Sequence, residues 1–154
     1  MKVAVAIITD AHGRILLTQR PLHAAHGGQW EFPGGKLEDE EEALAALKRE
    51  VKEEVGLQVL DAEFLATIEH TYGIKKVTLL VYCVDKFQGT PLCLESQIDL
   101  RWVDLEELSD YEFPEANEKI IQLLKLKKLR ALSQSGSFCA KDLLNPGDVS
   151  LGST

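Results

Sequence analysis

Residues 35–57 read GKLEDEEEALAALKREVKEEVGL. From about Glu40 to Val55 the apolar residues recur at the three- and four-residue spacing of a helix with one buried face. The residues of that face are Leu44, Leu47, Val51 and Val55. An acidic run over residues 38–42 lies at the start of this helix, where negative charge complements the helix dipole. Gly56 follows the last turn, a common place for glycine to end a helix, so the stretch predicts a helix of residues 40–55.

Three carboxylates of this helix, Glu50, Glu53 and Glu54, are spaced i, i+3, i+4. They fall within about 100° of one another on the helix surface, beside the apolar face. Carboxylates this close repel one another, and hard oxygen ligands at this density suit Mg²⁺ or Mn²⁺, which also bridge to phosphates. A second interpretation is a solvated acidic face paired with its basic neighbours, which is common on helices. The three carboxylates alone leave both interpretations open.

The spacing around these carboxylates is more informative. Five residues separate Gly35 from Glu41, and seven separate Glu41 from the run Arg49-Glu50-Val51-Lys52-Glu53-Glu54-Val55-Gly56-Leu57. Every fixed position of the Nudix box is present, and over about residues 1–130 the chain resembles the Nudix hydrolases, which act on nucleoside diphosphates linked to another moiety. The resemblance implies an α/β (α+β) fold, a sandwich in which a mixed β-sheet lies between helices.

The resemblance also implies roles for individual residues. The carbonyl of Gly34 and the carboxylates of Glu50, Glu53 and Glu54 match the family's metal ligands, and the glutamates match its catalytic positions. The metal, Mg²⁺ or Mn²⁺, would neutralise phosphate charge and lower the pKa of a water that attacks phosphorus in line. The positions that hold the loop–helix–loop in shape are Gly35, Glu41, Arg49 and Gly56, with an ion pair between Glu41 and Arg49.

Two segments outside the box resemble the MutT branch of the family, the 8-oxo-dGTP diphosphatases. They are residues 30–36 (WEFPGGK) and residues 113–117 (FPEAN). In that branch Arg20 and Lys36 match phosphate-binding positions, Phe32 matches a wall of the base pocket, and Asn117 matches the base-reading residue. Glu95, in the loop before a predicted strand, matches a glutamate that binds metal or acts as a base. A solvated loop residue is the alternative for Glu95.

The chemistry of Asn117 suits the role that the resemblance implies. The 8-oxo form of guanine carries a proton on N7, whereas unmodified guanine presents two acceptors, O6 and N7. One asparagine amide offers a donor for O6 and an acceptor for the N7 proton. In unmodified guanine the N7 lone pair would instead face the lone pair of the amide oxygen, which is unfavourable. The alternative is that Asn117 only helps to start the last helix, next to Pro114.

These residues favour an Mg²⁺-dependent enzyme that hydrolyses 8-oxo-dGTP to the monophosphate and pyrophosphate, and so cleans the nucleotide pool and avoids mutation. In the MutT branch the attack is at the β-phosphorus. One alternative is a Nudix pyrophosphatase for dCTP, another nucleotide, a dinucleotide or ADP-ribose. Another is a non-catalytic nucleotide-sensing module, although such modules usually lose box carboxylates. A fragment of an adenine glycosylase is disfavoured because the chain has no room for the glycosylase domain.

The rest of the chain predicts strands on either side of the box. Residues 3–9 form a central strand, and residues 14–20 form a second strand paired with the first across the turn at residues 10–13. Later strands are expected at residues 57–71, 76–87 and 98–103, followed by a helix from about residue 114 to 132. The domain is expected to span residues 1–132, with a Ser/Gly-rich tail over residues 133–154.

Composition limits the partners. The chain has 154 residues, 25 acidic against 17 basic side chains, and a formal net charge of −8. This acidity argues against a nucleic-acid polymer or an anionic membrane as a partner and leaves a small nucleotide as the substrate. The three cysteines, Cys83, Cys93 and Cys139, lack CxxC spacing, which together with the short apolar start of the chain favours a reduced, cytoplasmic protein. We expect a monomer.

Overall fold

The computed structural model describes residues 1–135 of the chain. Its elements in order are β1 (Lys2–Ile8), β2 (Ile15–Gln19), β3 (Trp30–Glu31), β4 (Gly34–Lys36), α1 (Ala43–Val55), β5 (Gln58–Tyr72), β6 (Lys75–Gln88), β7 (Asp99–Val103), the short 3₁₀ helix η1 (Leu105–Asp110) and α2 (Glu115–Ser135). A four-stranded mixed sheet has the order β4-β1-β6-β5, with β1 and β6 parallel. A three-stranded antiparallel sheet has the order β3-β2-β7.

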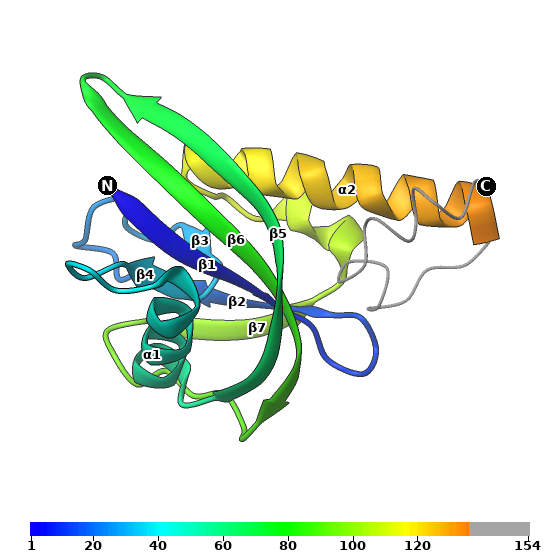
Figure 1. Cartoon of the computed structure of the whole chain (residues 1–154), viewed down its shortest axis with the longest axis horizontal. Helices are drawn as coiled ribbons and strands as arrows, with labels where there is room; N and C mark the ends of the chain where they lie inside the picture. Colours follow the sequence, from blue (N-terminus) through cyan, green and yellow to red (C-terminus); the bar gives the residue numbers. More distant parts are fainter. Residues whose placement is uncertain (136–154) are drawn as a thin grey trace.

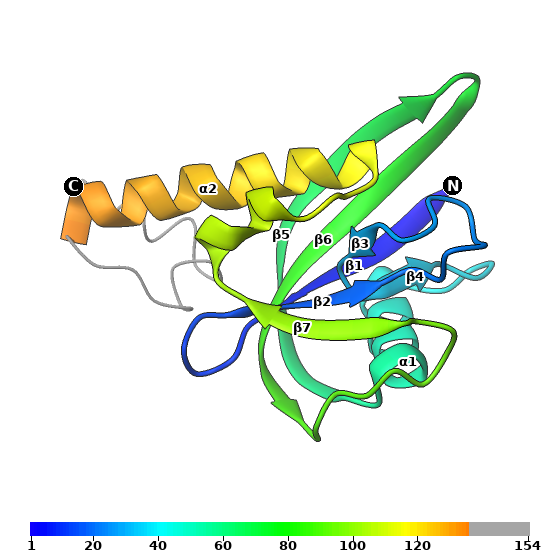
Figure 2. The same ribbon diagram turned by 180° about the vertical axis from the view of Figure 1, so that it is seen from behind.

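The two long helices lie on opposite sides of the four-stranded sheet (Figures 1 and 2). Alternate residues of β1 explain this arrangement, since successive side chains of a strand point to opposite faces. Ala4, Ala6 and Ile8 belong to a buried cluster with the apolar face of α1. Val5 and Ile7 belong to a second buried cluster, with the apolar face of α2. The predicted α/β sandwich with a mixed sheet between helices is therefore confirmed, as is the central position of the first strand.

The predicted pairing of the second strand with the first is wrong. β2 shares only the isolated bridge Thr9–Ile15 with the end of β1, and it pairs instead with β3 and β7 in the other sheet. Its residues Ile15, Leu16 and Leu17 are all fully buried. Both edges of β1 are already paired, with β4 along residues 3–5 and with β6 along residues 2–8, so the backbone of β2 pairs in the other sheet.

The box helix begins later than the sequence predicts. α1 starts at Ala43, because Glu40 has a left-handed backbone (φ 63°) that cannot continue a helix. The acidic run therefore precedes the helix, whose first turn holds no acidic residue. Leu44, expected in the buried face, is 37% exposed, and Ala46 is buried in its place. Gly56 ends the helix as predicted, at φ 75° with its N–H donating to the carbonyl of Lys52.

The remaining elements agree closely with the predicted ones. β5 and β6 form one long hairpin that turns at Gly73 and projects from the body of the molecule (Figure 1). The last helix starts one residue after Pro114 and buries Ile120, Ile121 and Leu124, as expected. It runs through Ser135, and the rest of the predicted tail, with Cys139, lies outside the described residues. Within residues 1–135 no helix is long and apolar enough to span a membrane.

Candidate metal and nucleotide site

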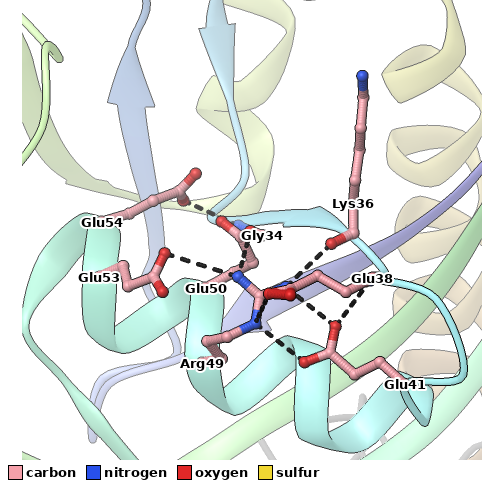
Figure 3. Close-up of polar contacts among 8 residues, drawn as sticks. All are labelled: Gly34, Lys36, Glu38, Glu41, Arg49, Glu50, Glu53 and Glu54. Carbon is pink, nitrogen blue, oxygen red and sulfur yellow. Dashed lines mark hydrogen bonds and ion pairs between the residues drawn. The ribbon is translucent and has the colours of Figure 1, made fainter.

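The backbone of β4 runs directly past two carboxylates of α1 (Figure 3). The Gly34 N–H donates to Glu54 Oε2 at 3.0 Å. At Gly35 a Cβ atom would lie 2.7 Å from Glu50 Oε1 and closer still to the rest of that carboxylate. A Cβ at Gly34 would collide with the Ala4 carbonyl of β1. Gly34 is thus required because β4 approaches the backbone of β1 too closely for a side chain, whereas a side chain at Gly35 would displace the carboxylate of Glu50.

Arg49 is the centre of the ionic contacts around this helix. Its guanidinium binds Glu41 through two bonds, Nε to Oε2 at 2.9 Å and Nη2 to Oε1 at 3.0 Å. It also lies 2.9 Å from Glu50, 3.2 Å from Glu38 and 3.6 Å from Glu53, and it donates to the Lys36 carbonyl at 3.1 Å. The hydrogen bonds from Arg49 lower the pKa of Glu41 to about 2. This fork ties the loop before α1 to the helix, which is the shape-holding geometry implied for Glu41 and Arg49.

Glu54 is placed where a carboxylate is difficult to ionise. Burial, together with the charges of Glu31, Glu50 and Glu95, raises its pKa to about 8, and the bond from the Gly34 N–H opposes this only in part. Burial also raises the pKa of Glu50, and the Arg49 contact only partly offsets this. Four carboxylates therefore share one partly buried region. A cation at this position would favour the ionised form of each of them.

The donor set fits a hard divalent ion. It consists of carboxylate oxygens backed by the Gly34–Gly35 backbone, the oxygen chemistry that Mg²⁺ and Mn²⁺ prefer. In residues 1–135 no three acidic, histidine or cysteine side chains are already gathered around one point. Glu53 is instead paired with Arg49, and Glu54 with the Gly34 N–H, so the two carboxylates point to different partners.

Glu95 approaches this region from the loop before β7. Its side chain is exposed, and its charge acts on both Glu50 and Glu54. Gln97 holds the loop in place: its Oε1 accepts the Glu95 N–H at 2.9 Å, and its Nε2 donates to the Glu54 carbonyl at 2.9 Å. No local sequence pattern identifies Gln97 as an anchor, because its partner Glu54 lies 43 residues away.

The two basic residues expected at phosphates lie in different surroundings. Arg20, at the end of β2, pairs with Glu31 at 3.0 Å and donates to the Ala25 carbonyl at 2.7 Å. Because the charge of Glu31 acts on Glu54, Arg20 lies beside the carboxylate region. Lys36 is exposed, and its side chain points away from the carboxylates (Figure 3). Only its backbone carbonyl joins the Arg49 contacts.

The residues expected at the base lie around the start of α2. Phe32 is buried and stacks on Phe113, with ring centroids 5.4 Å apart. Asn117 is half-buried in the first turn of α2, and its backbone N–H donates to the Pro114 carbonyl at 2.9 Å. That backbone bond fits the helix-starting role, and it leaves the side-chain amide available for a second role.

The fold agrees with what comparison with known proteins shows. The model of the NUDIX domain matches residues 4–123. The chain belongs to the Nudix family and is a Nudix hydrolase, a class of enzymes that generally need a divalent metal ion.

Three relatives describe its position within the family. The chain is 37% identical over 124 residues to an 8-oxo-dGTP diphosphatase of Haemophilus influenzae. The aligned residues make up 80% of this chain and 90% of that protein. It is 35% identical over 118 residues to a CTP pyrophosphohydrolase of Escherichia coli, and this alignment covers 77% of this chain and 87% of that protein. A solved MutT structure, from work on Aliivibrio salmonicida and Vibrio cholerae, superposes with a TM-score of 0.70 at 32% identity over 82% of this chain and 99% of that one.

Proposed function

We propose that this protein hydrolyses 8-oxo-dGTP to 8-oxo-dGMP and pyrophosphate with Mg²⁺ as the metal, Mn²⁺ being a substitute. The observation that carries the proposal is the partly buried carboxylate region, in which the pKa of Glu54 is raised to about 8 beside Glu31, Glu50 and Glu95. Its substrate is a small nucleotide, as in the family. The names of the relatives, 8-oxo-dGTP diphosphatase among them, support the choice of nucleotide.

In this proposal the carboxylates of Glu50, Glu53, Glu54 and Glu95 and the carbonyl of Gly34 hold the metal. When bound, the metal supplies positive charge for the phosphates and a more acidic water. Arg20, which is aimed by Glu31, and Lys36 bind the phosphate oxygens. Water forms a bond to the attacked phosphorus while the bond to the leaving phosphate oxygen breaks, and a carboxylate of the group accepts the water proton. Phe32 forms a wall of the base pocket.

Asn117 reads the base in this proposal. Its amide donates to O6 and accepts from the N7 proton of 8-oxoguanine, and unmodified guanine leaves the amide oxygen unmatched. The test is a comparison of kcat/KM for 8-oxo-dGTP, dGTP, dCTP, CTP and ADP-ribose with Mg²⁺. We expect at least about tenfold preference for 8-oxo-dGTP over dGTP, worth about 1.4 kcal/mol, and loss of that preference in Asn117→Ala. A preference that survives the substitution would refute the role of Asn117.

A second candidate is a pyrophosphohydrolase for CTP. It is favoured by the Escherichia coli relative of that name, which is nearly as similar to this chain as the Haemophilus influenzae protein. The same nucleotide panel separates the two, because a CTP enzyme would show its highest kcat/KM with CTP and no advantage for 8-oxo-dGTP.

Glu54→Gln tests whether the carboxylates are catalytic. It keeps the size of the side chain and removes its charge, so we expect Mg²⁺-dependent pyrophosphate release to fall by about a thousandfold or more. Release at the wild-type rate would contradict the proposed site.

We also propose that the enzyme acts as a monomer in the cytoplasm, where nucleotide pools are found. The mass of the protein measured by gel filtration tests whether it is a monomer.

A further inference from the structure

His70 of β5 is a buried polar side chain that packing alone does not explain. It is 8% exposed, and within residues 1–135 neither Nδ1 nor Nε2 has a hydrogen-bond partner. A neutral imidazole carries one donor and one acceptor, and leaving both unmatched in the interior costs free energy. An apolar ring would fill the same space without that cost, so the nitrogens need a reason to be there.

The surroundings of His70 indicate what the nitrogens face. Nε2 lies 3.6 Å from Oε2 of Glu115, the first residue of α2. This distance is a few tenths of an ångström beyond a good hydrogen bond. The imidazole also packs edge-on against Tyr72, two residues further along the same face of β5, with ring centroids 4.5 Å apart. A small movement of Glu115 toward β5 would therefore give His70 an acceptor.

Two hydrogen bonds already join the same end of β5 to the start of α2. Tyr72 Oη accepts the Ala116 N–H at 3.2 Å, and Lys119 Nζ donates to the Glu69 carbonyl at 2.9 Å. Glu115 and Ala116 directly precede Asn117 in the chain. The end of β5 thus contacts α2 on both sides of Asn117, at positions far apart in the sequence.

We propose that His70 and Tyr72 are positioning residues that set where the Asn117 amide lies, and thereby determine base selectivity without touching the base. The inference rests on the base-reading role proposed for Asn117. Tyr72 fixes the backbone one residue before Asn117, and His70 completes the arrangement by bonding Glu115 when the nucleotide engages the first turn of α2. Reading a base by hydrogen bonds depends on donor–acceptor distances within a few tenths of an ångström, so loosening this turn weakens discrimination.

The experiment uses Tyr72→Phe and His70→Phe, which keep a ring and remove only the polar atoms. Because His70→Phe removes two unmatched buried nitrogens, its melting temperature should not fall, and a merely structural role would predict no other effect. We expect each variant to lower the ratio of kcat/KM between 8-oxo-dGTP and dGTP about fivefold or more. Thr71→Val, at the exposed residue between them, is the matched control and should keep the wild-type ratio.

The outcomes separate this inference from the proposed function. If the wild-type enzyme distinguishes a different pair of nucleotides, the proposed substrate is wrong, and the positioning role of His70 and Tyr72 is then tested on the ratio for that pair. A ratio that stays within about twofold of wild type in both variants overturns the inference, whatever the substrate. In a double-mutant cycle with Glu115→Gln, the effects of His70→Phe and Glu115→Gln on the ratio should be less than additive. Fully additive effects would exclude the pairing of His70 with Glu115.

Discussion

Replacing Gly35 with alanine tests the carboxylate region through a single methyl group. The added Cβ would lie 2.7 Å from Glu50 Oε1, whereas ordinary contacts begin at 3.4 Å, so this oxygen must retreat by at least about 0.7 Å. Gly35 does not have a positive φ, so alanine brings no backbone strain, and the atoms in its way are the end of a flexible side chain. The fold should therefore tolerate the change while Glu50 moves.

The size of the effect follows from this displacement. Metal–ligand distances tolerate only about 0.2 Å, and a misplacement of about 1 Å at a reacting centre costs on the order of a hundredfold in rate. We expect kcat/KM at fixed Mg²⁺ to fall about a hundredfold, or about 2.7 kcal/mol. Raising the Mg²⁺ concentration should restore part of the loss, because a displaced ligand weakens metal affinity. The assay is pyrophosphate release over a Mg²⁺ titration, with melting temperature measured in parallel.

Gly13→Ala is the matched control for this experiment. Gly13 has φ 76° and open space where a Cβ would lie, the reverse of the situation at Gly35. Alanine should cost about 1–2 kcal/mol of stability there and leave kcat/KM unchanged. If Gly35→Ala keeps kcat/KM within about threefold of wild type at every Mg²⁺ concentration, Glu50 is not held in a catalytically important position against β4.

Three further substitutions address the loops around α1. Because the pKa of Glu41 is lowered from 4.5 to about 2, its pair with Arg49 stabilises the fold fully above about pH 4.5 and loses that effect as pH falls toward 2. Glu41→Gln should therefore be less stable than wild type at pH 7 in urea unfolding, with the difference vanishing near pH 2. Gly56→Ala should cost about 1–2 kcal/mol in the same assay, because φ is 75°. Gln97→Ala frees the Glu95 loop and should weaken apparent Mg²⁺ affinity about tenfold in the pyrophosphate assay at an unchanged melting temperature.

The sequence predicts this structure best where the signal is local. The helical period of α1, the glycine that ends it and the strand runs of β5 and β6 each depend on neighbours within a few residues, and the structure confirms them. The pairing of β2 is different. Its partner β7 lies about eighty residues further along the chain, and the hairpin signal of the turn at residues 10–13 pointed to the nearer strand. Both edges of β1 are occupied by β4 and β6, and a sequence does not display that long-range pairing.

The site follows the same division. The box spacing identified Glu50, Glu54 and the glycine pair, which the structure brings together through the Gly34 N–H. The role of Gln97 and the buried imidazole of His70 carry no signal in the sequence, since a single polar residue in a strand or loop is ordinary. They become visible only when their long-range neighbours are known, at Glu54 and at the start of α2.

The acidity of the box has two separate physical uses. Residues 35–57 hold eight acidic and four basic side chains, and a cation site alone would not need so many. Glu38 and Glu41 bind Arg49, so their charge shapes the loop before α1. Arg49 also contacts Glu50 and Glu53, whereas the Glu54 carboxylate is bonded to a neutral backbone N–H. Glu54 therefore has no contact with Arg49, and burial raises its pKa to about 8, so a divalent ion bound beside β4 would supply the positive charge that favours its ionised form.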